Sequence, residues 1–336
     1  MGEWIRSHRG PAARLSNEGR FPSLAGATGW LNTPPLTPDG LAERVVVVDF
    51  CTYTCINWLR TLPYVRAWAE RYADDGLVVI GAHTPEFSFE HDVDNVTEML
   101  AAMRVEFPIA LDNRYAVWDA FANHYWPALY FIGAGGRIRH HHFGEGDYER
   151  SEQVIQELLR EAGASDVGPD FVSVEGVGPE AEAAWSDLES PETYLGYERS
   201  RGFASPGGIV PKERHIYTAP ERLGTNQWAL AGDWTIDAES AVSNEPDGRI
   251  EFAFHARDVH LVMGPQDRRS SVPFRVTIDG EPLRDAAGSD VDHEGSGVLT
   301  QQRMHQLVRQ QGPIVDRRFA IEFLDGGAEG FAFTFG

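Results

Sequence analysis

The order of apolar and polar positions in the first half of the chain predicts alternating buried strands and amphipathic helices. Residues 44–50 contain an unbroken β-branched run, VVVV, and residues 77–83 (LVVIGAH) form a second apolar run. Continuous apolar runs of this length are typical of central strands in a parallel sheet. Residues 56–76 have apolar positions three apart, which predicts a helix that ends at Gly76 and is kinked at Pro63.

The same alternation continues to about residue 162. The further elements that it predicts are helices over 90–104, 115–121 and 149–162, and strands over 107–112, 128–133 and 137–143. The last two strands flank Gly135-Gly136, which predicts a hairpin. This order of elements predicts an α/β sheet with an antiparallel pair of strands at one end.

The second half of the chain has a different pattern. Short strands separated by turn residues recur from about residue 185 to the end, and 249–255 (RIEFAFH) alternate clearly between apolar and polar. This pattern predicts an all-β sandwich, which we expect to be of jelly-roll type. The expected organisation is an N-terminal arm over 1–41, an α/β domain over 42–162, a Gly-, Pro- and acid-rich linker over 163–184, and a β-sandwich over 185–336.

Charge narrows the classes of partner. The chain has 51 acidic and 29 basic residues and a formal net charge of −22, which argues against nucleic acid or an anionic membrane as a partner. No apolar run approaches the roughly 18–20 residues that span a bilayer. The first 21 residues lack the apolar core of a secretory signal and do not fit the myristoylation pattern. We therefore expect a cytoplasmic protein without a membrane partner.

The two cysteines of the chain, Cys51 and Cys55, lie four residues apart, where the first central strand gives way to a helix. Two thiols this close, with none elsewhere, indicate a site more than a disulfide framework. Cys55 is placed to meet the N–H groups and the positive dipole end of that helix, so we expect its pKa to be lowered.

A second element supports a thiol site. Pro127 follows Trp126 directly before the strand predicted over 128–133. Cis peptide bonds are almost confined to X–Pro, so Pro127 is a candidate for a cis bond that packs against an active thiol, as occurs in thioredoxin-like folds. An ordinary trans proline at the start of a strand is the alternative.

Several long motifs now suggest a family. The stretches VVVVDFCTYTCINWLRTLPYV, GLVVIGAHTPEFSFE, YWPALYFI and HFGEGDY resemble the thioredoxin-like domain of the DipZ family, within the TlpA-like and redoxin group. The stretches SPETYLGYERS, NQWALAGDW and FHARDVHLVMG resemble the carbohydrate-binding-module-like domain that follows it there. The resemblance implies a thioredoxin fold and thiol–disulfide oxidoreductase activity. DipZ proteins also carry a membrane domain, which we expect to be lacking here.

The chain departs from the family at the thiol motif. The family pattern is roughly F-W-T-Y-[ST]-C-I-N-C, whereas this chain has Trp58 at the position of the second cysteine and Cys51 at that of the tryptophan. A C-x-x-C cycle through Cys55 is therefore excluded. The first remaining interpretation is a C-x3-C pair, in which Cys55 attacks the substrate and Cys51 resolves the mixed disulfide. It requires that the two Cα atoms come within about 4.4–6.8 Å.

Three other interpretations stay open. Cys55 alone is a candidate peroxidatic thiol, with Thr52 in a T-x-x-C arrangement and Arg60 as a candidate partner. The two thiols are also candidate Cu(I) ligands, assisted by His83 or His124. In the last interpretation the domain has lost redox chemistry and serves as a scaffold. Apart from Cu(I), no cofactor is implied.

The remaining candidates are weaker. Glu86, in HTPEF, is a candidate acid or base for the thiol, or an ordinary loop carboxylate. The run His140-His141-His142 is interpreted as an exposed strand, because two residues on one face do not make a zinc site. Rings of the second half could bind sugars, although most are expected in the core; these are Trp228, Trp234, Tyr217 and Tyr197. The expected partners are a protein or small-molecule thiol or disulfide and a second copy of the chain, contacted through the sandwich.

Overall fold

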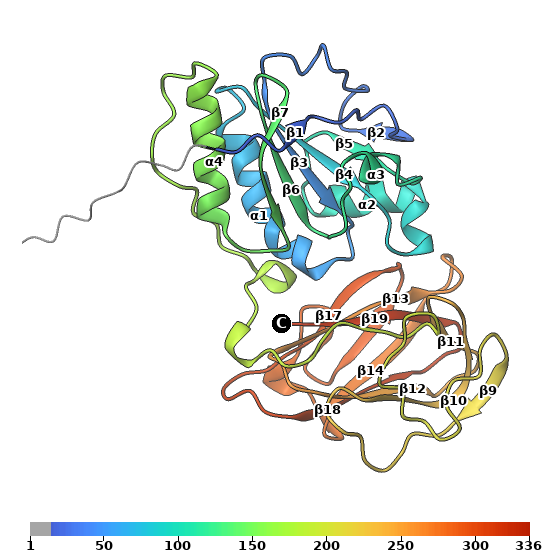
Figure 1. Ribbon diagram of the computed structural model, residues 1–336. Helices are drawn as coiled ribbons and strands as arrows, with labels where there is room; N and C mark the ends of the chain where they lie inside the picture. Colours follow the sequence, from blue (N-terminus) through green and yellow to red (C-terminus); the bar gives the residue numbers. More distant parts are fainter. Residues whose placement is uncertain (1–14) are drawn as a thin grey trace, which may run out of the picture. The chain divides into compact units, whose positions relative to one another are not determined.

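The computed structural model describes residues 15–336, whose contacts divide them between two units (Figure 1). Of the described residues, the first unit comprises 15–51, Tyr64–Thr84 and Met103–Ser173, and the second comprises Thr52–Pro63, Pro85–Ala102 and Val174–Gly336. The chain therefore passes repeatedly from one unit to the other. The beginning of the first long helix belongs to the second unit.

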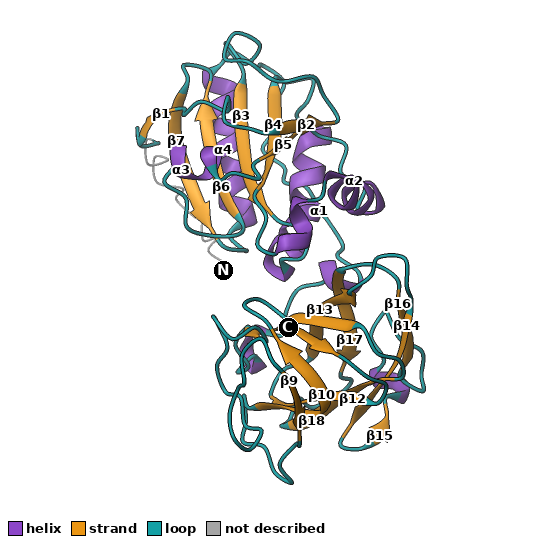
Figure 2. Cartoon of the chain, turned by 90° about the vertical axis from the view of Figure 1, so that its right-hand side faces the viewer, coloured by secondary structure: helices purple, strands orange, loops and turns teal. Residues whose placement is uncertain are grey.

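A mixed sheet forms the centre of the first unit, with seven strands among the described residues (Figure 2). In spatial order they are β1 (Gly19–Arg20), β7 (Arg137–Phe143), β6 (Ala128–Gly133), β3 (Val45–Cys51), β4 (Leu77–His83), β5 (Ile109–Leu111) and β2 (Gly29–Leu31). β3, β4 and β5 run parallel, whereas β6 lies antiparallel to β3 and β7 antiparallel to β6. The predicted α/β sheet with an antiparallel pair at one end is confirmed.

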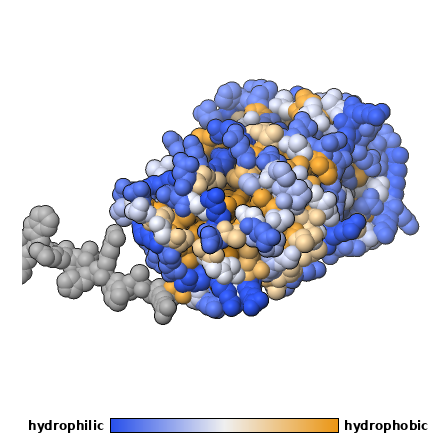
Figure 3. Space-filling model, turned by 90° about the horizontal axis from the view of Figure 1, so that it is seen from above, coloured by the Kyte–Doolittle hydropathy of each residue, from blue (hydrophilic) through white to orange (hydrophobic). Residues whose placement is uncertain are grey.

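The residues that precede β3 complete both edges of this sheet. β1 pairs with β7 and β2 pairs with β5, so the stretch expected to be an extended arm supplies two short edge strands. Residues 1–14 of that arm lie outside the described part of the chain. Its later residues line an apolar cavity of about 500 Å³, whose walls include Phe21, Trp30 and Leu41. On the face drawn in Figure 3, apolar side chains alternate with polar ones.

The helices follow the predicted apolar periods with two differences, and the first is that the helix expected over 56–76 ends at Arg71. They are α1 (Ile56–Arg71), α2 (Val93–Ala102), α3 (Ala116–Ala120) and α4 (Tyr148–Glu161), with 3-10 turns η1 (Ser88–His91), η2 (Gly178–Glu180), η3 (Trp185–Asp187) and η4 (Arg284–Ala286). The single helix expected over 90–104 is divided at Asp92. Its carboxylate accepts the N–H groups of Asp94, at 2.9 Å, and Asn95, at 3.2 Å. Asp92 thus ends η1 and caps α2.

The two faces of the first sheet are covered in different ways. On one face Phe50 of β3 packs edge-on against Trp118 of α3, with ring centroids 5.7 Å apart. On the α4 side the buried carboxylate of Glu152 accepts hydrogen bonds from Trp68 Nε1, at 3.2 Å, and from the Tyr72 hydroxyl, at 2.6 Å. A buried carboxylate with two side-chain donors fixes how α4 lies against the end of α1.

Gly81 on β4 provides a test of this packing. A Cβ at Gly81 would lie 2.5 Å from Cδ1 of Ile109 and 3.3 Å from Cε2 of Phe107. We therefore expect Gly81→Ala to lower the free energy of unfolding by about 1–3 kcal/mol through overpacking, measured by urea denaturation. Gly135→Ala is the matched control, because a Cβ there meets nothing within 4 Å. Equal stabilities of the two variants would contradict the packing described here.

The second unit contains an antiparallel β-structure in which β10 (Trp228–Ile236) belongs to two sheets. The first sheet adds β12 (Gly248–Phe254), β18 (Arg317–Phe323), β14 (Val272–Ile278), β15 (Glu281–Pro282) and β16 (Ser296–Leu299). The second adds β9 (Arg214–Tyr217), β11 (Ala241–Ser243), β19 (Ala328–Phe335), β13 (Asp258–Pro265), β17 (Arg303–Arg309) and β8 (Thr193–Tyr194). The all-β character predicted for the second half is confirmed.

Aromatic side chains from both sheets meet in the core of this unit. Phe252 of β12 lies 5.1 Å from Phe333 of β19, measured between ring centroids. Trp228 and Trp234 are fully buried, and Tyr217 is nearly so. Three of the four rings considered as a sugar platform are therefore core residues, and only Tyr197 is partly exposed.

Two buried histidines lie on neighbouring strands of the second unit, His260 on β13 and His305 on β17. Burial lowers the pKa of His260 to about 3, and the Arg60 cation acts in the same direction. Burial likewise lowers the pKa of His305 to about 3, together with the charge of Arg303. Both imidazoles are therefore neutral in the folded protein at neutral pH.

This burial predicts a loss of stability in acid. Between the ordinary pKa of 6.5 and the folded value near 3, the unfolded chain binds more protons than the folded one. The free energy of unfolding should therefore fall as the pH falls, by about 2 kcal/mol per histidine between pH 8 and 5. His260→Gln and His305→Asn should each flatten this slope in urea denaturation. Unflattened slopes for both core variants would refute the prediction.

Candidate thiol site

Cys55 occupies the N-cap position of α1. Its N–H donates to the carbonyl of Thr52 at 3.2 Å, and its carbonyl accepts from the N–H of Leu59 at 3.0 Å. The thiol is half-buried and faces the backbone N–H groups of Asn57 and Trp58 at the start of the helix. The strand-to-helix position predicted for Cys55 is therefore the position found.

The direction of the Cys55 pKa is opposite to the one expected. Burial of the sulfur raises the pKa of the Cys55 thiol, and the charge of Glu86 raises it further. The N–H groups of Trp58 and Asn57 favour the thiolate but do not outweigh these effects. The expectation of a lowered pKa was wrong because it counted the helix start and neither the burial of the sulfur nor the carboxylates near it.

Cys51 is the last residue of β3 and is completely buried. Its carbonyl accepts the N–H of Thr84 at 2.9 Å, and its sulfur lies over Gly81, 3.6 Å from where a Cβ would be. His83 of β4 is its register partner in the parallel pair, so the two side chains share one face of the sheet. Both cysteines are thiols in this structure, and no disulfide joins them.

The Trp126-Pro127 peptide bond is cis, as the sequence suggested. The indole Nε1 of Trp126 donates to the carbonyl of Thr84 at 3.1 Å, and its ring lies 4.3 Å from that of Trp118. The Thr84 hydroxyl in turn donates to the buried carboxylate of Asp112, at 3.3 Å. Thr84 therefore connects the end of β3 with the tryptophan that precedes the cis proline.

Glu86 has partners that the sequence did not indicate. Its Oε1 accepts from the hydroxyl of Tyr194 at 2.6 Å and from Nη1 of Arg199 at 2.9 Å. Its backbone N–H donates to the carboxylate of Glu90 at 2.6 Å. All of these residues belong to the second unit, together with Cys55. Cys51, Trp126 and Pro127 belong to the first.

Glu90 is a buried carboxylate close to the start of α1. Its Oε1 accepts from the hydroxyl of Thr54 at 2.7 Å, and its Oε2 accepts the N–H groups of Glu86 and Phe87. Burial raises the pKa of Glu90 to about 7, against these hydrogen bonds. The sequence signal was an acid that follows two phenylalanines in FSFE, which predicts a buried carboxylate only when the fold is known.

Glu90 gives a second prediction about pH. Between the ordinary pKa of 4.5 and the folded value near 7, the folded protein binds more protons than the unfolded chain. The contribution of Glu90 to the free energy of unfolding should therefore be lost as the pH rises, by about 2–3 kcal/mol from pH 5 to 8. Glu90→Gln should remove this loss in urea denaturation and leave the opposite trend of the buried histidines. A slope identical to that of the parent protein would contradict the assignment.

Asp49 is a further residue that the sequence interpretation overlooked. It lies two positions before Cys51 on β3, hence on the same face of the sheet, and it is completely buried. The signal was present in the sequence, because a single carboxylate interrupts the apolar run VVVVDF. Carboxylates are rarely buried in a central strand without a partner or a role.

The residues of the other interpretations are less suitably placed. Arg60 is buried and donates from Nη2 to the carbonyl of Phe335, at 3.2 Å. His124 is exposed, and the His140-His141-His142 run lies on β7, where His141 contacts Glu18 at 2.7 Å. Within residues 15–336, no three His, Cys, Asp or Glu side chains are grouped so that they could hold a metal ion.

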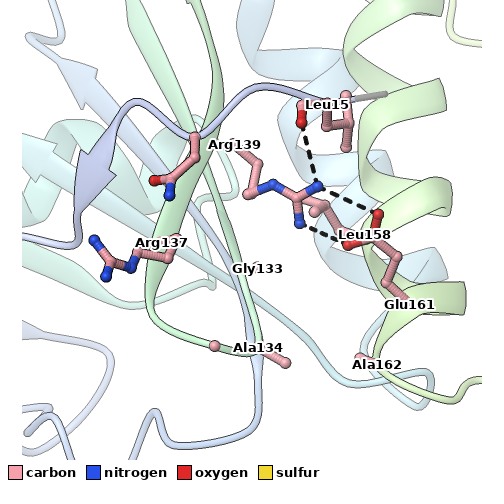
Figure 4. A pocket seen from close by; sticks show the side chains of 10 residues that line it. Leu15, Gly133, Ala134, Arg137, Arg139, Leu158, Glu161 and Ala162 are labelled. Atoms are coloured by element: carbon pink, nitrogen blue, oxygen red, sulfur yellow. Dashed lines mark hydrogen bonds and ion pairs between the residues drawn. The ribbon is translucent and has the colours of Figure 1, made fainter. Parts of the chain in front are cut away.

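A second cavity, of about 480 Å³, lies at the opposite end of the first sheet from Cys51 (Figure 4). It is lined by Arg137, Arg139 and Glu161, among others. Arg139 donates to the Glu161 carboxylate at 2.6 Å and to the carbonyl of Leu15 at 3.4 Å. Its charge is thus offset by a side chain of the cavity itself, and the cavity adds nothing to the thiol site.

Comparisons with known proteins relate both halves of the chain to known sequences. Residues 190–336 match the family described as "Thioredoxin like C-terminal domain". Thiol-disulfide oxidoreductase YkuV of Bacillus subtilis is 28% identical over 141 residues, which cover 42% of this chain and 95% of that protein. A solution structure of a thioredoxin-like protein in the oxidized form, 28% identical, covers 44% of this chain and 97% of that one, with a TM-score of 0.39. The chain is similar in sequence to thioredoxin-like proteins.

A more extensive relative is protein DipZ of Mycobacterium tuberculosis, which is 39% identical over 280 residues. The match covers 81% of this chain, and the chain is a DipZ homologue. It spans 39% of the length of DipZ. Of the helices in the described residues, none combines the length and apolar character needed to cross a bilayer.

Proposed function

We propose that the chain is a thiol–disulfide oxidoreductase in which Cys55 attacks a disulfide of a protein or small-molecule substrate. The observation that carries the proposal is the position of Cys55 at the N-cap of α1, where its sulfur faces the N–H groups of Asn57 and Trp58. These N–H groups stabilise the thiolate that performs the attack. The names of the relatives, among them thiol-disulfide oxidoreductase YkuV, support the same reaction.

The reaction requires a second thiol, and Cys51 is the only other cysteine in the chain. The Cys55 thiolate forms a bond to one substrate sulfur and displaces the other as a thiolate. Cys51 then attacks the sulfur of Cys55, which releases the second substrate thiol and leaves a Cys51–Cys55 disulfide. The substrate gains two electrons and the two protons that the cysteines lose. An external thiol reductant restores the pair.

Two side chains support the proton transfers of this cycle. The charge of Glu86 acts on the Cys55 thiol, and Glu86 is proposed as its acid or base. His83 shares the register position and the sheet face of Cys51, so it is proposed to accept the Cys51 proton. Trp126 and cis-Pro127 are proposed to frame the substrate groove.

The proposal also covers the antiparallel β-structure of the second unit. We expect the strands of this β-structure, in the order given above, to follow a jelly-roll path. The core positions of Trp228, Trp234 and Tyr217 make these rings unsuitable for binding a sugar. We expect the unit to act on the thiol site rather than to bind polysaccharide.

Variants of the two cysteines test the proposal. Cys55→Ser should lower the rate of insulin disulfide reduction at least about 100-fold, because it removes the attacking thiolate. Cys51→Ser should stop the cycle one step later and accumulate a mixed disulfide between Cys55 and the substrate, visible in non-reducing mass spectrometry.

The oxidised parent protein supplies the control. Mild oxidation should produce the Cys51–Cys55 disulfide, seen as a loss of about 2 Da that reduction reverses. A protein that forms no such disulfide and reduces no substrate would refute the proposal. Sulfenic acid at Cys55, with Cys51 still a thiol after peroxide treatment, would indicate a peroxidatic thiol instead.

A further inference from the structure

The segment around β8 supplies two polar side chains to Glu86, those of Tyr194 and Arg199, and Glu192 contacts the first of them. The Tyr194 hydroxyl lies 2.6 Å from Oε1 of Glu86 and 2.7 Å from Oε2 of Glu192. Arg199 donates to the same Glu86 oxygen at 2.9 Å, and its guanidinium carbon lies 3.4 Å from the centre of the Tyr194 ring. Glu86 is thus fixed by a hydroxyl and a cation that lie more than 100 residues further along the chain.

The loop that carries Glu86 is held against the same strands. The ring of Phe87 lies 5.3 Å from that of Phe331 on β19 and 6.3 Å from that of Tyr194. The backbone N–H of Ser88 donates to the carboxylate of Glu239, at 3.2 Å. Together with the N–H of Glu86 that binds Glu90, these contacts leave the Glu86 side chain little freedom of position.

The hydrogen bonds of Tyr194 require an additional proton. A phenol has one hydrogen, so it can donate to only one of its two carboxylate neighbours. The contact with Glu86 is the donated one, because Arg199 stabilises Glu86 as an anion. The contact with Glu192 then needs a proton on Glu192, which donates to the phenol oxygen.

The surroundings of Glu192 are consistent with a proton on its carboxyl group. The side chain is exposed over much of its length, but its carboxyl group lies against the Tyr194 hydroxyl. Withdrawal of that group from water and the charge of Glu86 raise the pKa of Glu192 to about 7. The charges of both Glu86 and Glu192 also act on the Cys55 thiol.

We propose that Glu192, Tyr194 and Arg199 are positioning residues for the Cys55 thiol, which hold Glu86 in place and store one proton beside it. This inference rests on the proposed thiol function. The ionisable groups that face Glu86 are Glu90, Glu192, Tyr194 and Arg199. While Glu192 keeps its proton, the Cys55 thiolate meets one carboxylate, which Arg199 offsets. When Glu192 loses the proton, a second negative charge opposes the thiolate.

The pH dependence of Cys55 alkylation tests the role of the proton on Glu192 without requiring disulfide exchange. The reduced full-length protein is treated with iodoacetamide from pH 5 to 10, and modification of Cys55 and of Cys51 is followed separately by peptide mass spectrometry. The rate for Cys55 should rise with pH but flatten near pH 7, where Glu192 ionises. Glu192→Gln should remove the flattening and raise the rate at pH 8 about tenfold, because one negative charge is lost.

Two further variants separate this role from a purely structural one. Tyr194→Phe keeps the ring but not the hydroxyl that contacts Glu192, so the pH at which the rate flattens should move away from 7. Glu198→Gln removes an exposed charge in the same segment and should reproduce the parent profile. Parent-like profiles for both Glu192→Gln and Tyr194→Phe would overturn the proton store. That result would leave the proposed oxidoreductase function intact. Conversely, a parent protein that exchanges no disulfide would not change the meaning of the alkylation profiles.

Discussion

The hydrogen bonds of Thr84 hold together the end of the first sheet where Cys51 and the cis proline lie. Its N–H binds the carbonyl of Cys51, its carbonyl binds the indole of Trp126, and its hydroxyl binds Asp112. Each of these groups comes from a different part of the chain. The carboxylate of Asp112 also accepts the N–H groups of Val117 and Trp118, so the start of α3 joins the same network. The position of the cis proline therefore follows from the parallel pairing of β3 and β4.

The carboxylates near Cys55 set a competing constraint. A helix N-terminus favours a thiolate, yet the second unit places the charges of Glu86 and Glu192 within reach of the sulfur. Both effects are local, and the burial of the thiol strengthens each of them, since less water screens the charges. The outcome is a thiol that stays protonated more readily than an exposed cysteine. Such a thiol gains reactivity when a substrate or a proton donor changes the charge of its neighbours.

Much of the first unit was accessible from sequence because its central strands are buried and β7 follows β6 in a hairpin. The runs at 77–83, 128–133 and 137–143 match the strand boundaries, and the position of Cys55 before α1 follows from the strand-to-helix transition. The cis bond at Pro127 was one of two alternatives that its place before a strand left open. These features depend on local pattern, which a single sequence contains.

The remainder of the site could not be predicted in that way. The pKa of Cys55 depends on Glu86, and the position of Glu86 depends on Tyr194 and Arg199, more than 100 residues away. Nothing in the local sequence around Tyr194 indicates that its hydroxyl binds a loop of the other half of the chain. The expectation of a single helix over 90–104 was wrong for a simpler reason, because the capping role of Asp92 was overlooked.

The repeated crossing of the chain between its two units has a consequence for evolution and for protein engineering. Thr52–Pro63 and Pro85–Ala102 are neighbours in sequence of the first sheet, but their contacts assign them to the unit of the C-terminal strands. Domain shuffling exchanges contiguous segments. A shuffled chain that received a different C-terminal half would keep its thioredoxin-like sheet and lose the surroundings of its thiol. Substitutions at Tyr194 or Arg199 are therefore expected to be coupled in their effects to substitutions at Glu86.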